Sequence, residues 1–232
     1  MSPVLASALL GGALAVDSRS SIRLLVSQPV CGGLLAGLVL GDPRGGFLAG
    51  ALLQTMFLGY VALRGLRAPD LPLGGVASAA VCVLARRGAG VAPSDGGLVL
   101  FLALLVGLAA ALAGGAVYRL WEGRSYALTV RALRYIDEGR FRLAAALHLS
   151  TVALHFALGG AIVAVATALG APLAAVLAAR APETWSGALR PIGSLVPFIG
   201  VGSLIVLNST RIRLSLFLAG FLVAYLVFFF SG

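Results

Sequence analysis

The chain has 232 residues, of which 60% are hydrophobic and 11% are charged, and its mean hydropathy is +1.04. Because a soluble domain of this size keeps about a quarter of its residues charged, this composition excludes a globular domain in water and predicts an all-α polytopic membrane protein. The net charge of +9 comes from 17 arginines with no lysine, and these lie mostly in short gaps between apolar runs. That placement indicates the flanks of membrane segments and argues against a nucleic-acid partner.

The first apolar run, residues 3–16, ends in an Ala-Leu-Ala sequence that is similar to a signal-peptidase site. No Lys or Arg precedes it, although a secretory signal begins with positive charge. We therefore expect residues 3–16 to be retained as the first membrane segment.

The remaining apolar stretches are unequal in length, and several are shorter than the roughly 20 residues that a full membrane span requires. After a polar connector at 17–23 they cover residues 24–41, 45–63, 71–85, 97–118, 143–169, 171–179, 188–207 and 212–230. Internal Gly and Pro residues, such as Pro29, Pro172 and Pro197, are typical of the broken helices and re-entrant hairpins of transporters. An irregular bundle of tilted, kinked helices is the alternative.

Polar residues interrupt the apolar runs in the first third of the chain, and one more follows the run at 188–207. Polar groups at membrane depth survive where protein or a watery cavity surrounds them, and the hydroxyls of a sugar suit carboxylates and side-chain amides. The candidate substrate-binding residues are Gln28, Asp42, Gln54, Arg64, Asp70 and Asn208. For Asp42 an equally good alternative is a solvated turn with Arg44, whereas Gln54 lies inside an apolar run and resists that explanation.

Glycines recur at four-residue spacing in the same region, at Gly33 and Gly37 and again at Gly46 and Gly50. This spacing lets membrane helices approach closely. It favours tight packing between helices of the same chain, and packing between copies in a homo-oligomer is the alternative.

Residues 119–142 form the longest polar segment, with six arginines against three acids. Tyr126, Val130, Leu133 and Ile136 recur at helical spacing, which predicts an amphipathic helix within a single membrane domain, 1–232. The arginine excess places this helix on the cytoplasmic side. It could lie along the membrane surface, dock against a partner, or connect two membrane segments in solvent.

No set of residues in the sequence predicts catalysis or a cofactor. Cys31 and Cys82 are far apart and lack the spacing of a metal site or a redox pair. His148 and His155 share one helical face, where they could relay protons or accept a phosphoryl group, but hydrogen bonding between packed helices is the simpler use. A membrane-embedded enzyme would need a paired acid and base, which we do not find.

The first third of the chain resembles the membrane IIC subunit of the mannose/fructose/sorbose-type bacterial phosphotransferase system (PTS). The resemblance is carried by residues 16–60, VDSRSSIRLLVSQPVCGGLLAGLVLGDPRGGFLAGALLQTMFLGY, and by RAPD at 67–70. It shows as an acidic residue after the first apolar helix, a Pro that begins the next, Gly-x-x-x-Gly-Asp, a second glycine-rich run and a later Pro-Asp. Weaker similarity continues at 136–141 (IDEGRF), 147–150 (LHLS), 181–183 (APE) and 187–208.

The resemblance implies a sugar-translocating subunit of the bacterial cytoplasmic (inner) membrane with an elevator-type fold. It also implies a IID-type membrane partner and cytoplasmic IIA and IIB subunits that phosphorylate the small sugar, so that no catalytic residue or cofactor belongs to this chain. The family's substrate-facing positions correspond to Asp42, Gln54 and Asp70.

Two departures from the family bear on the substrate. Gln54 replaces a common glutamate, and Ala62, Leu63 and Arg64 replace a stretch similar to Asn-Ile-Gly. Both changes make the site more positive, which could favour a sugar with an anionic group or abolish sugar binding. The alternative hypothesis is therefore a PTS-derived membrane interaction protein that does not transport sugar.

Overall fold

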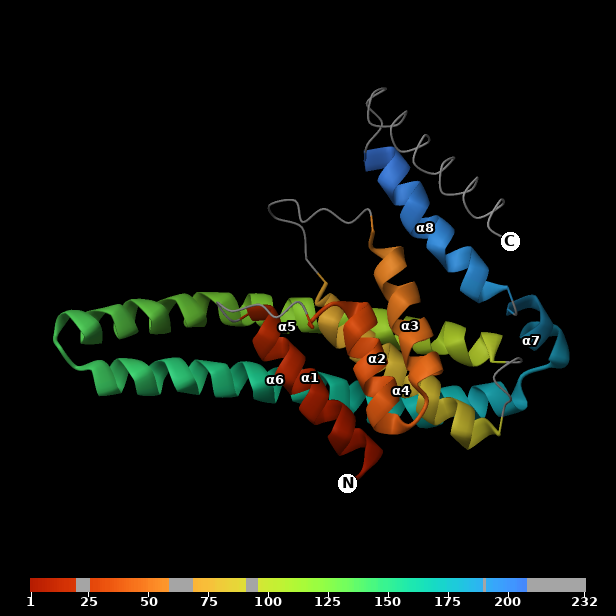
Figure 1. The fold of residues 1–232 in the computed structure, drawn as a ribbon, viewed down its shortest axis with the longest axis horizontal. Helices are drawn as coiled ribbons and strands as arrows, with labels where there is room; N and C mark the ends of the chain where they lie inside the picture. The colour runs from red at the N-terminus through yellow and green to blue at the C-terminus, as the bar shows by residue number, and fades with distance from the viewer. Residues whose placement is uncertain (20–25, 59–68, 91–95, 190, 208–232) are drawn as a thin grey trace, which may run out of the picture.

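The computed structural model describes residues 1–19, 26–58, 69–90, 96–189 and 191–207, and the regular elements in these ranges are all helices (Figure 1). The helices are α1 (Pro3–Arg19), α2 (Pro29–Leu40), α3 (Pro43–Met56), α4 (Leu71–Ala89), α5 (Gly97–Asp137), α6 (Phe141–Arg180), α7 (Glu183–Leu189) and α8 (Ile192–Leu207). The all-α prediction is confirmed for this part of the chain.

Helix α4 lies at the centre of the molecule. It contacts the α2–α3 hairpin on one side and the long α5 and α6 helices on the other. Every residue from Leu73 through Val83 is buried, including Ser78 and Cys82. Because most of these residues are Gly, Ala or Val, helices can pack close to α4 on all sides.

Helices α5 and α6 run side by side as a long antiparallel pair, and their far halves project beyond the other helices as a two-helix arm (Figure 1). With 41 and 40 residues, each is about 60 Å long at 1.5 Å per residue, twice the thickness of a hydrocarbon core. Within the described residues, Gly97–Trp121 and Phe141–Arg180 are long and apolar enough to cross a bilayer.

The apolar and polar segments of the sequence do not correspond one to one with the helices of this pair. The separate apolar stretches 143–169 and 171–179 form one helix, α6, with Pro172 inside it. The amphipathic segment predicted at 119–142 is helical, but it is the far half of α5 together with the turn into α6 rather than a separate element.

Helices α2 and α3 form a tight hairpin through their glycines. A Cβ atom on Gly33 would lie 2.6 Å from the carbonyl oxygen of Gly46 and 2.7 Å from the Cα of Gly50. The turn itself needs Gly41, which has a φ of +79°, a left-handed conformation that side chains disfavour. Tight packing within the chain, predicted from the glycine spacing, is confirmed for this hairpin.

Helix α1 crosses α6 at a second set of glycines. A Cβ atom on Gly12 would lie 2.7 Å from the carbonyl oxygen of Phe156, and one on Gly160 would lie 3.0 Å from that of Ala8. The contacts of α1 are mainly with α6, so apolar packing fixes most of its length. Its last turn, by contrast, meets the starts of α2 and α4 through polar groups.

Candidate functional site

The end of α1 and the starts of α2 and α4 surround a cleft of about 290 Å³. We call it the helix-start cleft, and its lining residues are Ser18, Ser27, Gln28, Pro29, Pro69, Leu71 and Pro72. Its volume is close to the lower end of the range for small-molecule pockets, roughly 300–1,000 Å³. Its lining combines hydroxyls and an amide with apolar rings, a mixture that suits a small polar solute.

The sequence explains why two helices begin at this cleft. Pro29 starts α2 and Pro72 lies in the first turn of α4, positions where the missing N–H of proline is not needed. The first backbone N–H groups of a helix lack partners within the helix, and the helix dipole places partial positive charge there. At the helix-start cleft, Gln54 and Asp70 already accept from the N–H groups of Val30 and Leu73, so the two helix starts contribute mainly the positive ends of their dipoles.

Gln28 is the predicted site residue that lines this cleft. It occupies the N-cap position of α2, but its side chain makes no capping hydrogen bond, and the residue is exposed. Its amide is therefore placed to donate to and accept from a solute.

Gln54 lies near the end of α3 and is half-buried. Its Oε1 accepts a hydrogen bond of 3.0 Å from the backbone N–H of Val30, in the first turn of α2. Gln54 therefore has a structural role that the sequence did not indicate. Its amide oxygen pairs with a backbone N–H at the start of α2, which would be costly to leave unpaired at membrane depth.

Asp70 is buried beside the cleft, between the lining residues Pro69 and Leu71. Its carboxylate accepts from the backbone N–H of Leu73 at 3.3 Å, which caps α4, and forms an ion pair with Arg19 at the end of α1. The side chain of Asp70 is 2% exposed, so it does not point into bulk solvent.

Asp42 lies at the other end of the α2–α3 hairpin. Its carboxylate caps α3 by accepting from the backbone N–H of Gly45 at 2.9 Å, and it lies 3.7 Å from Arg86 of α4. The 12 residues of α2 separate this turn from Gln28 by about 18 Å. One small solute cannot reach both residues in this arrangement.

The remaining predicted site residues, Arg64 and Asn208, lie outside the described residues. His148 is exposed on α6. The ring of His155 lies 5.7 Å from that of Tyr118 on α5, and the backbone carbonyl of His155 accepts a 3.0 Å hydrogen bond from the Tyr118 hydroxyl. His155 therefore lies where α5 and α6 pack, and hydrogen bonding by its imidazole stays a prediction.

Three residues at the cleft were not predicted from the sequence as site residues. They are Arg19 and Ser18, in the polar connector at 17–23, and Ser27 just after it. One signal points to a cation near Asp70, because an acid at membrane depth needs one. Several arginines stand near the ends of apolar runs, so this signal does not select Arg19 by itself.

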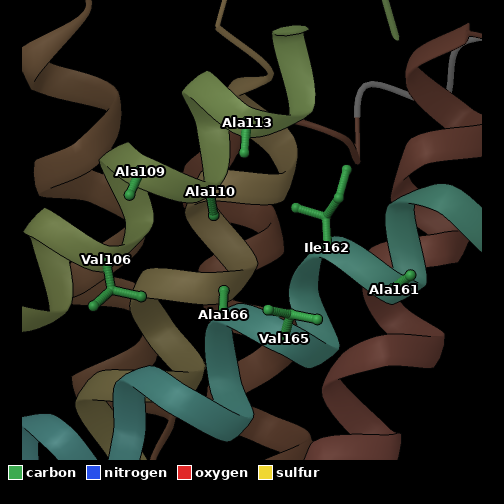
Figure 2. A pocket seen from close by; sticks show the side chains of 8 residues that line it. All are labelled: Val106, Ala109, Ala110, Ala113, Ala161, Ile162, Val165 and Ala166. Atoms are coloured by element: carbon green, nitrogen blue, oxygen red, sulfur yellow. The ribbon is translucent and has the colours of Figure 1, made fainter. Parts of the chain in front are cut away.

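A second cavity, of about 380 Å³, lies between α5 and α6 (Figure 2). Its walls are Val106, Ala109, Ala110 and Ala113 of α5 and Ala161, Ile162, Val165 and Ala166 of α6. These side chains offer no hydrogen-bonding group to a sugar, so this cavity is not the candidate solute site. In the part of the chain that the structure describes, no group of His, Cys, Asp and Glu could hold a metal ion.

Comparisons with known proteins agree with this architecture. The model of a protein family described as the sorbose-specific IIC component of the PTS matches residues 4–229. A comparison with curated protein sequences gives no match. A solved structure described as "Structure of membrane protein" has a TM-score of 0.72 and 20% identity, and the match covers 96% of this chain and 86% of that chain. The "CryoEM Structure of Mannose Transporter ManYZ and Microcin E492 (MceA) complex" has a TM-score of 0.57 and 19% identity with the same coverage.

Proposed function

Since the chain belongs to the family of sorbose-specific IIC components of the PTS, and is therefore a membrane subunit of a sugar-transport system, we propose that it binds a small sugar in the helix-start cleft. It carries that sugar across the bacterial cytoplasmic (inner) membrane as a multi-pass permease. The phosphoryl-transfer residues belong to partner subunits. This chain supplies the binding site and the path.

The convergence of two helix starts on one polar cleft is the observation that carries this proposal. Transporters commonly place the N-terminal ends of short or broken helices at the substrate. Sugar hydroxyls can accept from the side-chain amide of Gln28 and can donate to side-chain oxygens. Gln28 and the two serines provide those oxygens.

The α2–α3 hairpin is the element that we assign to the moving core of an elevator-type transporter. Its helices have 12 and 14 residues, too few for a full span of roughly 20, so it enters the membrane as a re-entrant hairpin. Its glycine contacts make it one compact unit, and its open end, with Gln28, faces the cleft. A rigid hairpin can carry a bound solute without changing its own packing.

The partners in this proposal are a IID-type membrane subunit and cytoplasmic IIA and IIB subunits. The similar mannose transporter was solved as ManYZ. In this chain the arm exposes large apolar side chains, with Tyr126 73% and Leu133 56% exposed. An exposed apolar stripe on a helix is typical of a surface that another chain or the bilayer covers.

The second candidate function is a membrane interaction protein without transport. The same exposed stripe favours it, as does Gln54, whose oxygen is already used to cap α2. Transport of any sugar by the assembled system would exclude this candidate.

Uptake of labelled hexoses, amino sugars and uronates tests the proposal in cells that make this chain with its IID, IIA and IIB partners. Replacing Gln28→Ala removes one solute-facing amide without removing a helix cap. We expect uptake at low sugar concentration to fall about fivefold, because a neutral hydrogen bond contributes roughly 0.5–1.5 kcal/mol.

Ser150→Ala is the control, since Ser150 is exposed on α6 and bonds only within its own helix turn. It should transport like the wild type. Wild-type uptake in Gln28→Ala would contradict the cleft as the solute site. Absence of uptake from the complete wild-type system, with every sugar tested, would favour the non-transporting alternative.

A further inference from the structure

Arg19 joins three helices at the edge of the helix-start cleft. Its guanidinium pairs with the carboxylate of Asp70 at the start of α4 and lies over the ring of Tyr118 on α5, 3.3 Å from the ring centroid. Tyr118 in turn donates to the carbonyl oxygen of His155 on α6. The last residue of α1 is therefore bound at the point where α4, α5 and α6 meet.

A second polar contact ties the same turn of α1 to the start of α2. The carboxylate of Asp17 accepts a hydrogen bond of 3.1 Å from the backbone N–H of Ser27. Ser18, between Asp17 and Arg19, accepts from the Arg19 guanidinium at 3.0 Å and itself lines the cleft. The end of α1 thus forms one wall of the cleft, and polar contacts to both helix starts hold that wall in place.

The two halves of α1 are held by different forces. Its glycines pack against α6, where Gly11 would clash with Val163 if it carried a Cβ atom. At its end, the attachment to α4 depends on an ion pair in which Asp70 is almost fully buried and Arg19 is 25% exposed. Separating Arg19 from Asp70 needs no repacking of apolar side chains, but it leaves a buried carboxylate without its cation, so the attached position of the α1 end is strongly favoured while the pair is intact. Once the pair is broken, this end can move while the rest of α1 stays packed on α6.

We propose that the Arg19–Asp70 ion pair is a latch that holds the end of α1 across the helix-start cleft, and that Arg19 is a positioning residue whose release widens the cleft. The consequence for transport, that the latch must open for a solute to enter or leave, rests on the function proposed above. The latch itself is independent of that function, because it concerns only how the end of α1 is attached to the start of α4.

The test measures access to the cleft without any solute. Ser27→Cys places a thiol on the cleft wall, and Cys31→Ala removes the nearby native thiol. Cys82 stays as an internal standard, because it is fully buried in α4. In purified protein in detergent, we expect Arg19→Gln to raise the rate at which a charged, water-soluble thiol reagent modifies position 27 about tenfold or more, while Cys82 stays unmodified.

Asp70→Asn provides the second arm of the test. Asparagine keeps an oxygen that caps α4, so the helix start is preserved while the charge is lost. We expect the same rise in the rate at position 27, and no further rise when both substitutions are combined, because they break one interaction. Arg19→Lys keeps the cation and should stay near the wild-type rate. Arg140→Gln, which removes an exposed ion pair on the arm, should have no effect.

Two results would overturn the latch. One is an unchanged rate at position 27 in both Arg19→Gln and Asp70→Asn. The other is joint modification of position 27 and Cys82, which would show that the ion pair stabilises the whole bundle and does not control the cleft. Absence of sugar uptake in the complete wild-type system would count against the proposed function and leave the thiol measurement intact.

Discussion

At the scale of single residues, three of the polar side chains that suggested a solute site also complete helix starts. Gln54 accepts from the N–H of Val30, Asp42 from that of Gly45, and Asp70 accepts from the first turn of α4. An unpaired backbone N–H at membrane depth costs several kcal/mol. A polar residue in an apolar run is therefore explained by a helix start as readily as by a solute. Of the predicted site residues that the structure describes, only Gln28 lines the cleft without a side-chain cap hydrogen bond.

Asp42 allows the two contributions of a capping carboxylate to be separated. Asp42→Ala removes both the cap of α3 and the contact with Arg86, and should lower the free energy of unfolding in detergent by about 1–2 kcal/mol. Asp42→Asn keeps the cap and should lose less than Asp42→Ala, and its loss measures the pair with Arg86, whose side chain is only 12% exposed. Denaturant titration of both variants checks this. Equal losses would assign the stabilisation to the ion pair instead.

The residues of the site differ in how far the sequence could predict them. Asp42-Pro43 and Asp70 two residues before Pro72 are local patterns of helix starts, and each predicts its own cap. The Arg19–Asp70 pair joins residues 51 positions apart, across a contact between α1 and α4. Such a pairing depends on how the helices pack, and no local pattern specifies it.

At the scale of elements, the α2–α3 hairpin depends on glycine more than on any large side chain. Gly33, Gly37, Gly46 and Gly50 bring the two backbones into direct contact, and a Cβ atom on Gly46 would meet the backbone of Gly37. Backbone atoms cannot rotate aside as side chains do, so even one added methyl group must separate the helices. Dispersion between closely packed backbones is what stabilises such pairs in a membrane.

Gly33→Ala tests this packing against a matched glycine. We expect it to lower the free energy of unfolding by about 1–3 kcal/mol through overpacking. Gly123→Ala lies in the arm with nothing within 4 Å of its Cβ position, and should be neutral or stabilise by up to about 1 kcal/mol. Thermal unfolding in detergent, followed by circular dichroism, distinguishes the two. A stable Gly33→Ala variant would show that the hairpin can separate at little cost.

Hydropathy predicts which residues of α5 and α6 are apolar, but it does not predict where these helices end. It predicts an apolar stretch ending at residue 118, yet α5 continues to Asp137. Hydropathy marks where lipid ends, whereas the following residues, rich in Ala, Leu and Arg, remain good helix formers in water. In α6, Gly170 and Pro172 do not break the helix, because neighbouring helices can support a freed backbone group.

At the scale of the whole molecule, packing within the described part of the chain does not account for the exposed apolar side chains on the arm of α5 and α6. It projects beyond the other helices (Figure 1), and Leu120, Tyr126 and Phe141 are 81%, 73% and 65% exposed. The sequence predicted an amphipathic helix here from its spacing, but the exposure of the stripe could not be known without the fold. The arm is therefore where we expect the IID-type partner to bind.

Leu133→Glu tests the arm as the site of that partner. Leu133 is 56% exposed and belongs to the apolar stripe, and glutamate preserves helix propensity, so the isolated chain should fold and stay as stable as the wild type. Burying its charge against a partner would be costly, and we expect copurification with the IID-type subunit to fall at least about tenfold. Arg131→Glu, on the polar side of the same helix, should leave copurification unchanged. If both variants still copurify with the partner, the partner binds another surface of this chain, and the apolar stripe contacts the bilayer instead.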